Sequence, residues 1–166
     1  MSATLIVMVP FIIGLLSLSA IFSAAETSLT GASRGRMHQL EREGDRAAGR
    51  VNTLISDQET MIGSVLLGNN LINILASALA TEVLTRSIPG AWGVVAATGI
   101  MTVMVLVFAE VLPKTLAISR PDDVARALSA PTLIVVKLFG PVVFAVQFFV
   151  RQTLRGFGIK IGRAHV

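Results

Sequence analysis

The stretch MVLVFAEVLPKTLAIS, from Met104 to Ser119, places a carboxylate, a proline and a lysine inside a long apolar run. Ionisable groups in a membrane segment are costly and usually face a bundle interior, where they mark an ion path, a proton relay or an internal ion pair. The carboxylate is Glu110, and Lys114 lies one helical turn after it. The stretch therefore predicts a membrane-spanning helix that carries a functional polar group.

Pro113 adds a free backbone oxygen to this helix. Proline has no N–H to donate, and its ring crowds the carbonyl four residues earlier, which is that of Ala109. In hydrocarbon a free carbonyl must find another partner, such as a neighbouring helix, a water or a cation. We interpret the partner as a hard metal ion next to Glu110, with the kink at Pro113 as a hinge for its release.

The composition is that of a membrane protein. Of 166 residues 53% are hydrophobic and only 14% are charged, where a soluble domain has about 25% charged residues. Three runs of the chain contain no charge: Met1 to Ala25, Met61 to Thr81, and Ile88 to Ala109. Each is about 20 residues or longer, the length of a helix that crosses a bilayer. We predict an all-α membrane protein with three spans, at about 3–27, 61–83 and 88–118.

The remaining segments, about 33–58 and 122–157, are expected to form amphipathic helices at the membrane interface. The run from Leu128 to Val150 is apolar enough for a fourth span. Proline, glycine and lysine interrupt it, and a fourth crossing would carry the basic residues after it to the outside. We favour the interfacial placement. The fourth span stays open as the alternative, since proline and glycine also occur in real transmembrane helices.

The basic residues indicate an orientation. Five arginines follow the first predicted span, only Arg86 follows the second, and seven lysines or arginines follow the third. By the positive-inside rule the N-terminus lies outside and the C-terminus in the cytoplasm. The net charge of +4 thus reflects topology, because no nucleic-acid-binding motif is present. The chain has no cysteine, HExxH or GxSxG, so we expect no thiolate site and no enzyme.

Oxygen-bearing side chains gather at one depth. With a rise of about 1.5 Å per residue, Ser23, Asn69 and Glu110 all fall in the inner half of the membrane. Asn69 and Asn73 share a helix face, and Gly68 lets another backbone approach closely. An all-oxygen set with one carboxylate suits Mg²⁺, Ca²⁺ or Na⁺ rather than zinc or copper. A weak cation site is therefore predicted, as a transporter requires if the ion is to leave.

Each of these residues also has an ordinary structural explanation. Asparagine and serine in membranes commonly hydrogen-bond between helices, and a helical serine can bond its own backbone. Glu110 could pair with Lys114. Small residues at four-residue spacing, Ala76 with Ala80 and Ser77 with Thr81, support dimerisation, although this pattern is common in membrane helices.

Three motifs carry a family resemblance: FSAAETSL (22–29), LLGNNLIN (66–73) and FAEVLPKTLA (108–117). They resemble the transmembrane domain of the CorC and CNNM (cyclin M, DUF21) magnesium transporters. The resemblance covers roughly residues 15–158, so we assign 1–158 to one such domain. We expect 159–166 to be a tail or the remnant of a truncation or tag.

The resemblance implies a homodimer of three-helix protomers in the cell membrane, moving Mg²⁺ out of the cytoplasm in exchange for Na⁺. An inward-facing site for dehydrated Mg²⁺ is implied at the matching positions: Ser23, Gly68, Asn69, Asn73 and Glu110, followed by Pro113. Asn70 is adjacent at a position that the family motif leaves variable. Full-length relatives continue into a pair of cytoplasmic CBS domains, which this chain lacks. A Mg²⁺-sensing scaffold and a channel-like module are the alternatives.

Overall fold

The computed structural model describes residues 2–88 and 90–156, and in that part every regular element is a helix. The prediction of an all-α membrane protein is confirmed. The predicted tail 159–166 lies outside the described residues. The helices are, in order, α1 (Ser2–Gly31), α2 (Arg34–Arg42), α3 (Arg46–Ser56), α4 (Gln58–Ser87), α5 (Ala91–Met104), the π-helix η1 (Val105–Val111), α6 (Leu112–Ser119) and α7 (Pro121–Gly156).

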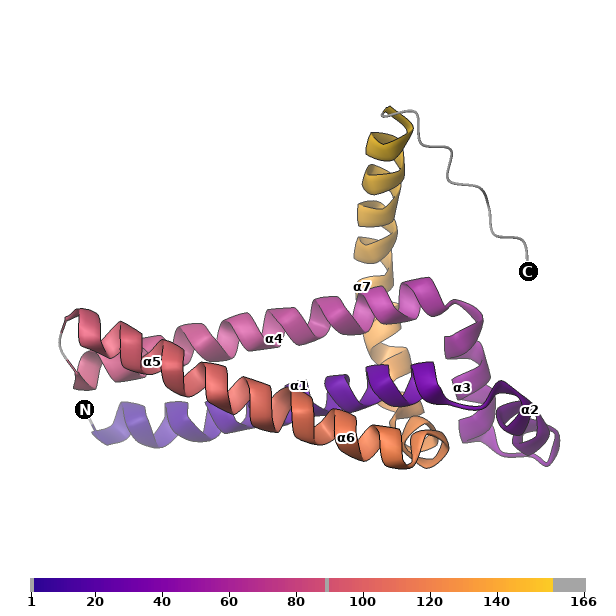
Figure 1. Cartoon of the computed structure of the whole chain (residues 1–166), viewed down its shortest axis with the longest axis horizontal. Coiled ribbons are helices and arrows are strands. Elements are labelled where there is room, and N and C mark those ends of the chain that lie inside the picture. The colour runs from indigo at the N-terminus through magenta and orange to yellow at the C-terminus, as the bar shows by residue number, and fades with distance from the viewer. Residues whose placement is uncertain (1, 89, 157–166) are drawn as a thin grey trace.

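Three long helices run alongside one another: α1, α4, and the continuous rod made by α5, η1 and α6 (Figure 1). The α4–α5 turn contains Gly90, whose φ of 78° is a left-handed conformation that glycine adopts readily. On this side of the bundle the core consists of apolar side chains of α1, α4, α5 and η1. At the other end, Phe22 and Leu29 of α1 pack with Met61 and Val65 of α4 and with apolar residues of α3.

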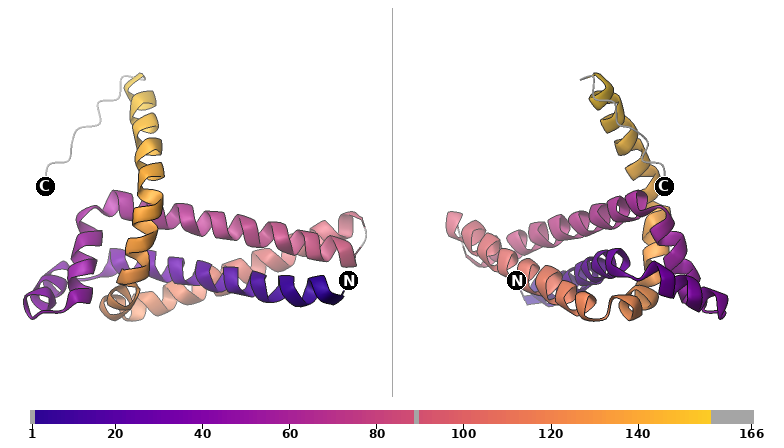
Figure 2. Two further views of the ribbon diagram at one scale, coloured as in Figure 1. Left: turned by 180° about the vertical axis from the view of Figure 1, so that it is seen from behind. Right: turned by 45° about the vertical axis from the view of Figure 1, so that its right-hand side comes forward.

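Within the described residues, four stretches are long and apolar enough to cross a bilayer, judged by length and composition: Ile6–Gly31, Gln58–Ser87, Ala91–Ser119 and Pro121–Thr153. Three of them correspond to the predicted spans. The fourth, within α7, lies across the other three and projects away from them in every view (Figures 1 and 2). A helix lying across a membrane-spanning bundle cannot cross the same bilayer alongside it. The orientation of α7 therefore favours the interfacial placement.

Polar contacts tie α2 and α3 to the beginning of α7, at the end of the bundle that carries the arginine-rich segment. Asp45 caps α3 and forms an ion pair with Arg126 of α7, with 2.5 Å between Oδ2 and Nη2. Asp122 accepts a hydrogen bond from the backbone N–H of Ser33 at 2.8 Å. The hydrogen bond from the Ala47 N–H, with smaller effects from Ala48 and Arg126, lowers the pKa of Asp45 although burial opposes this. Asp45 therefore joins the start of α3 to α7.

The small residues considered for dimerisation lie on two different faces of α4. Ala76 and Ala80 are buried inside the protomer, at 0% and 3% exposure, in a cluster with Leu15 and Leu16 of α1. Their suggested role between protomers is therefore wrong, because α1 already covers this face. The homodimer itself stays a prediction.

Candidate functional site

The helix that carries Glu110 widens at that residue into the π-helix η1. Short π-helical segments inside α-helices are frequent at functional sites. The N–H of Leu112 donates to the carbonyl of Val107, five residues earlier, and the next residue is Pro113, which has no N–H. With this five-residue spacing, the N–H that Pro113 lacks would have donated to the carbonyl of Phe108. With ordinary α-helical spacing it would have donated to the carbonyl of Ala109. The wider turn and Pro113 together weaken backbone hydrogen bonding next to the carboxylate.

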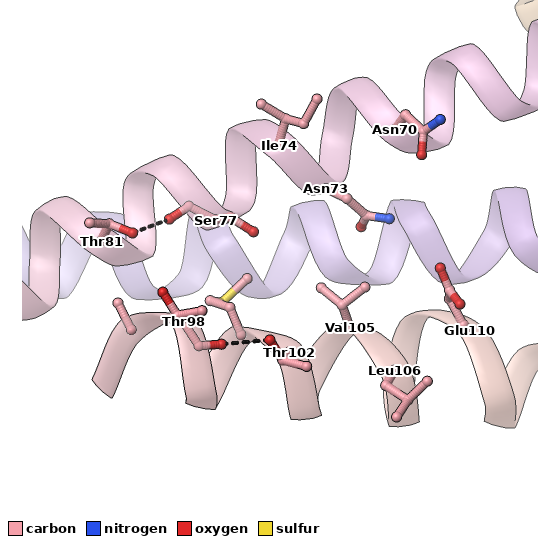
Figure 3. A pocket seen from close by; sticks show the side chains of 12 residues that line it. Asn70, Asn73, Ile74, Ser77, Thr81, Thr98, Thr102, Val105, Leu106 and Glu110 are labelled. Atoms are coloured by element: carbon pink, nitrogen blue, oxygen red, sulfur yellow. Dashed lines mark hydrogen bonds between the residues drawn. The ribbon is translucent and has the colours of Figure 1, made fainter. Parts of the chain in front are cut away.

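A cavity of about 680 Å³ lies between α4 and the α5–η1 rod. Asn70 and Asn73 line it from α4, and Glu110 lines it from η1 (Figure 3). The rest of the lining comes from small, hydroxylated and apolar residues: Ile74, Ser77, Thr81, Ala97, Thr98, Met101, Thr102, Val105 and Leu106. Glu110 is thus the single carboxylate among neutral oxygen atoms, and its side chain points into the cavity rather than away from the bundle.

A second group of oxygens forms where α4 meets α1. The Ser19 Oγ lies 2.5 Å from Asn69 Oδ1 and 2.8 Å from Asn73 Oδ1. A serine hydroxyl has one proton, so it can donate to only one of these oxygens at a time. The close approach of three oxygens is satisfied when one amide turns its NH₂ group toward Ser19 or when a cation lies between them. Asn73 belongs to this cluster and to the cavity lining, so it connects the two.

Ser19 is a site residue that the sequence interpretation missed. It is fully buried and lies four residues before Ser23, so the two serines share a face of α1. This four-residue spacing is the feature of the sequence that could have identified Ser19 as a site residue. What identifies Ser19 is its pairing with two residues about fifty positions later in the chain, a pairing that only the packing of α1 on α4 creates.

We predict that Ser19→Ala destabilises the α1–α4 contact, because it removes the donor that Asn69 and Asn73 share. Hydrogen bonds between membrane helices contribute about 0.6 to 1.7 kcal/mol, so the thermal midpoint in detergent should fall measurably. Ser17→Ala is the matched control, since the exposed Ser17 hydroxyl donates only to the carbonyl of Ile13 within its own helix. Equal midpoints for the two variants would show that the cluster does not hold these helices together.

The other predicted residues do not line the cavity. Ser23 is fully buried, and its hydroxyl has no hydrogen-bond partner within the described part of the chain. Gly68 lies against Phe22 and Phe139, and a Cβ there would come within 2.9 Å of the Phe22 ring. Ala109 is buried in the cluster that includes Leu15 and Leu16 of α1. The structure therefore groups Asn70, Asn73 and Glu110 at the cavity, and Ser19, Asn69 and Asn73 at the α1 contact.

Lys114 does not neutralise Glu110. Among residues 2–88 and 90–156 no ion pair joins the two side chains, although they are one turn apart. The same part of the chain contains no cluster of three or more His, Cys, Asp or Glu side chains that could hold a metal. A cation at the cavity would therefore be held by one carboxylate and neutral oxygens. Pro113, three residues after this carboxylate, is buried at the start of α6.

Comparison with known protein sequences assigns the chain to one family. Residues 10–166 match the family model of the cyclin M transmembrane N-terminal domain. The chain is 44% identical to the UPF0053 inner membrane protein YfjD of Escherichia coli over 146 residues, which are 86% of this chain and 33% of that protein.

Two further relatives agree with this match. The identity is 35% to a UPF0053 protein of Haemophilus influenzae, covering 88% of this chain and 34% of the relative. The identity is 37% to a chloroplastic DUF21 domain-containing protein of Arabidopsis thaliana, covering 88% of this chain and 22% of that protein. The chain thus spans about a third of the length of its bacterial relatives and less of the plant one. The resemblance carried by the three motifs is confirmed, and this membrane protein belongs to the cyclin M (CNNM, DUF21) transmembrane domain family.

Proposed function

We propose that this domain carries Mg²⁺ out of the cytoplasm, with Glu110 as the charged ligand of the transported ion. The observation that supports this most directly is the position of Glu110 in a cavity between two membrane-spanning helices, unpaired with Lys114 and facing Asn70 and Asn73. An intramembrane carboxylate in such surroundings is most simply explained by an ion path.

The donor set fits a hard cation. Mg²⁺ takes oxygen ligands in near-octahedral geometry and loses water reluctantly. The oxygens present are the Glu110 carboxylate, the amides of Asn69, Asn70 and Asn73, and serine hydroxyls. The fully buried Ser23 hydroxyl has no partner within the described residues, so it is free to turn toward an ion. One formal negative charge keeps binding weak enough for release.

We further propose that Na⁺ entering down its gradient drives Mg²⁺ export, and that the domain works as a homodimer in the cell membrane. The arginine-rich α2 and α3 lie at the end of the bundle opposite the N-terminus (Figure 1). The positive-inside rule then supports an external N-terminus and a cytoplasmic C-terminus. CBS domains in a full-length form would follow α7 on the cytoplasmic side.

The test is Mg²⁺ flux in proteoliposomes that contain the purified protein, with a Na⁺ gradient of either sign. Exchange predicts that Mg²⁺ moves uphill and reverses direction when the Na⁺ gradient is reversed. Flux that follows only the Mg²⁺ gradient would indicate the channel-like alternative. Mg²⁺ binding by calorimetry without any flux would indicate the sensing scaffold, and neither binding nor flux would refute the proposed function.

A further inference from the structure

The α4–α5 cavity continues well beyond Glu110, toward the turn that joins the two helices. Four hydroxyl side chains line this continuation, Ser77 and Thr81 from α4 and Thr98 and Thr102 from α5 (Figure 3). Thr81 lies eight residues from Asn73, and Thr102 lies eight residues from Glu110, which corresponds to about 12 Å along each helix. The three threonine hydroxyls are therefore separate from the oxygens around Glu110, whereas Ser77 lies one helical turn from Asn73.

The protons of the three threonine hydroxyls in this part of the cavity are already used. Thr81 donates to the carbonyl of Ser77 at 2.8 Å, Thr98 to that of Val94 at 2.9 Å, and Thr102 to that of Thr98 at 2.7 Å. A hydroxyl that donates its one proton retains lone pairs that accept. The three threonines thus present acceptor oxygens to the cavity, and Glu110, further along, is the one charged side chain in its lining.

Such a surface suits a cation that keeps its water. The water molecules around Mg²⁺ point their hydrogens outward and need acceptors, which the threonine oxygens supply. An anion would need donors, and those of the three threonines are committed to backbone carbonyls. The cavity is open along one side, where Thr98 and Thr102 are exposed. Its volume of about 680 Å³, counted from Asn70 and Glu110 to Thr81, is large beside the roughly 30 Å³ that a water molecule occupies in the liquid, so a hydrated ion fits within it.

From this arrangement we infer that Ser77, Thr81, Thr98 and Thr102 form a chamber in which Mg²⁺, after leaving Glu110, regains its hydration shell on the way to the outer face. The inference rests on the proposed transport function and adds a second site to the ion pathway. The chamber offsets the loss of protein ligands on release, because the ion exchanges the protein oxygens around Glu110 for water before it reaches the end of the bundle.

The first test removes the acceptors at nearly constant volume, in the triple variant Thr81→Val, Thr98→Val, Thr102→Val. Mg²⁺ flux should fall by about tenfold or more, since three hydrogen-bond acceptors are lost. Mg²⁺ binding in detergent should be unchanged, because Glu110 and the asparagines remain. Thr115→Val is the control, since Thr115 also donates to its own helix but is exposed on α6 outside the cavity.

The outcomes separate the two proposals. Absence of flux in the unmodified protein contradicts the proposed function itself. Normal flux in the triple variant, with flux abolished by Glu110→Gln, refutes the chamber alone.

The second test measures access without relying on transport. The chain contains no cysteine, so Thr98→Cys introduces a single thiol. We expect a cationic methanethiosulfonate to modify it faster than an anionic one, and added Mg²⁺ to slow the reaction. Modification only by an apolar maleimide would show that lipid or protein fills the groove, and would overturn the inference.

Discussion

Glu110→Gln is expected to reduce Mg²⁺ flux in proteoliposomes by about a hundredfold or more. Glutamine has nearly the same size as glutamate, so the variant removes the charge and leaves the packing of η1 in place. Removing one partner of a buried charge interaction costs roughly 3 kcal/mol or more, and each 1.36 kcal/mol corresponds to a factor of ten. Mg²⁺ binding measured by calorimetry should weaken together with flux.

The matched control for this variant is Glu82→Gln. Glu82 lies near the C-terminal end of α4, outside the cavity lining, and pairs on the surface with Arg86 at 2.5 Å. It loses the same charge without touching the proposed path, so its flux should equal that of the unmodified protein. Thermal unfolding and gel filtration confirm that both variants are folded. Unchanged flux in Glu110→Gln would remove this carboxylate from the transport mechanism.

Gly93→Ala is expected to destabilise the protein markedly. A Cβ at this position would lie 2.4 Å from the carbonyl oxygen of Ile88 and 2.9 Å from the Cα of Thr85. Both are backbone atoms, so no side-chain rotation can relieve the overlap, and the tight α4–α5 turn must open. Overpacking of this kind costs about 1 to 3 kcal/mol.

Gly99→Ala provides the control on the same helix. A Cβ there would meet nothing within 4 Å, and alanine is favoured over glycine in a helix by up to about 1 kcal/mol. The two substitutions should therefore shift the thermal midpoint in opposite directions. Unfolding can be followed in detergent through the single tryptophan, Trp92, which lies beside Gly93. A midpoint for Gly93→Ala at or above that of the unmodified protein would contradict the packing of this turn.

Glu110→Gln and Gly93→Ala test different properties of the contact between α4 and the α5–η1 rod. Gly93 allows α4 and α5 to approach closely at their turn, while Glu110 lies where the π-helical segment and Pro113 disturb the same rod. The helices are thus in close contact at one end and separated by the cavity further along. Rigid packing at the turn holds the cavity walls at a defined distance, so loss of the turn should also reduce transport.

The amino-acid sequence by itself determined the helical membrane class, the positions of the long apolar helices and the family. These depend on patterns within single segments: charge-free runs of span length, a carboxylate within one of them, and three short motifs. It also identified Glu110, Asn70 and Asn73, which the structure finds together at one cavity. Local composition decides whether a segment can enter a membrane, and that part of the problem requires no knowledge of its neighbours.

Only the tertiary structure decided which faces meet. It revealed Ser19 beside Asn69 and Asn73, turned Ala76 and Ala80 inward against α1, and laid α7 across the bundle although its composition suits a span. It also opened the α4–α5 cavity and widened the helix around Glu110 into a π-turn. The physical reason is that these features depend on the rotation and register of helices that lie far apart in the sequence. Hydrophobicity places each helix in the membrane but does not drive helices together in lipid, where packing and interhelical hydrogen bonds decide which residues touch.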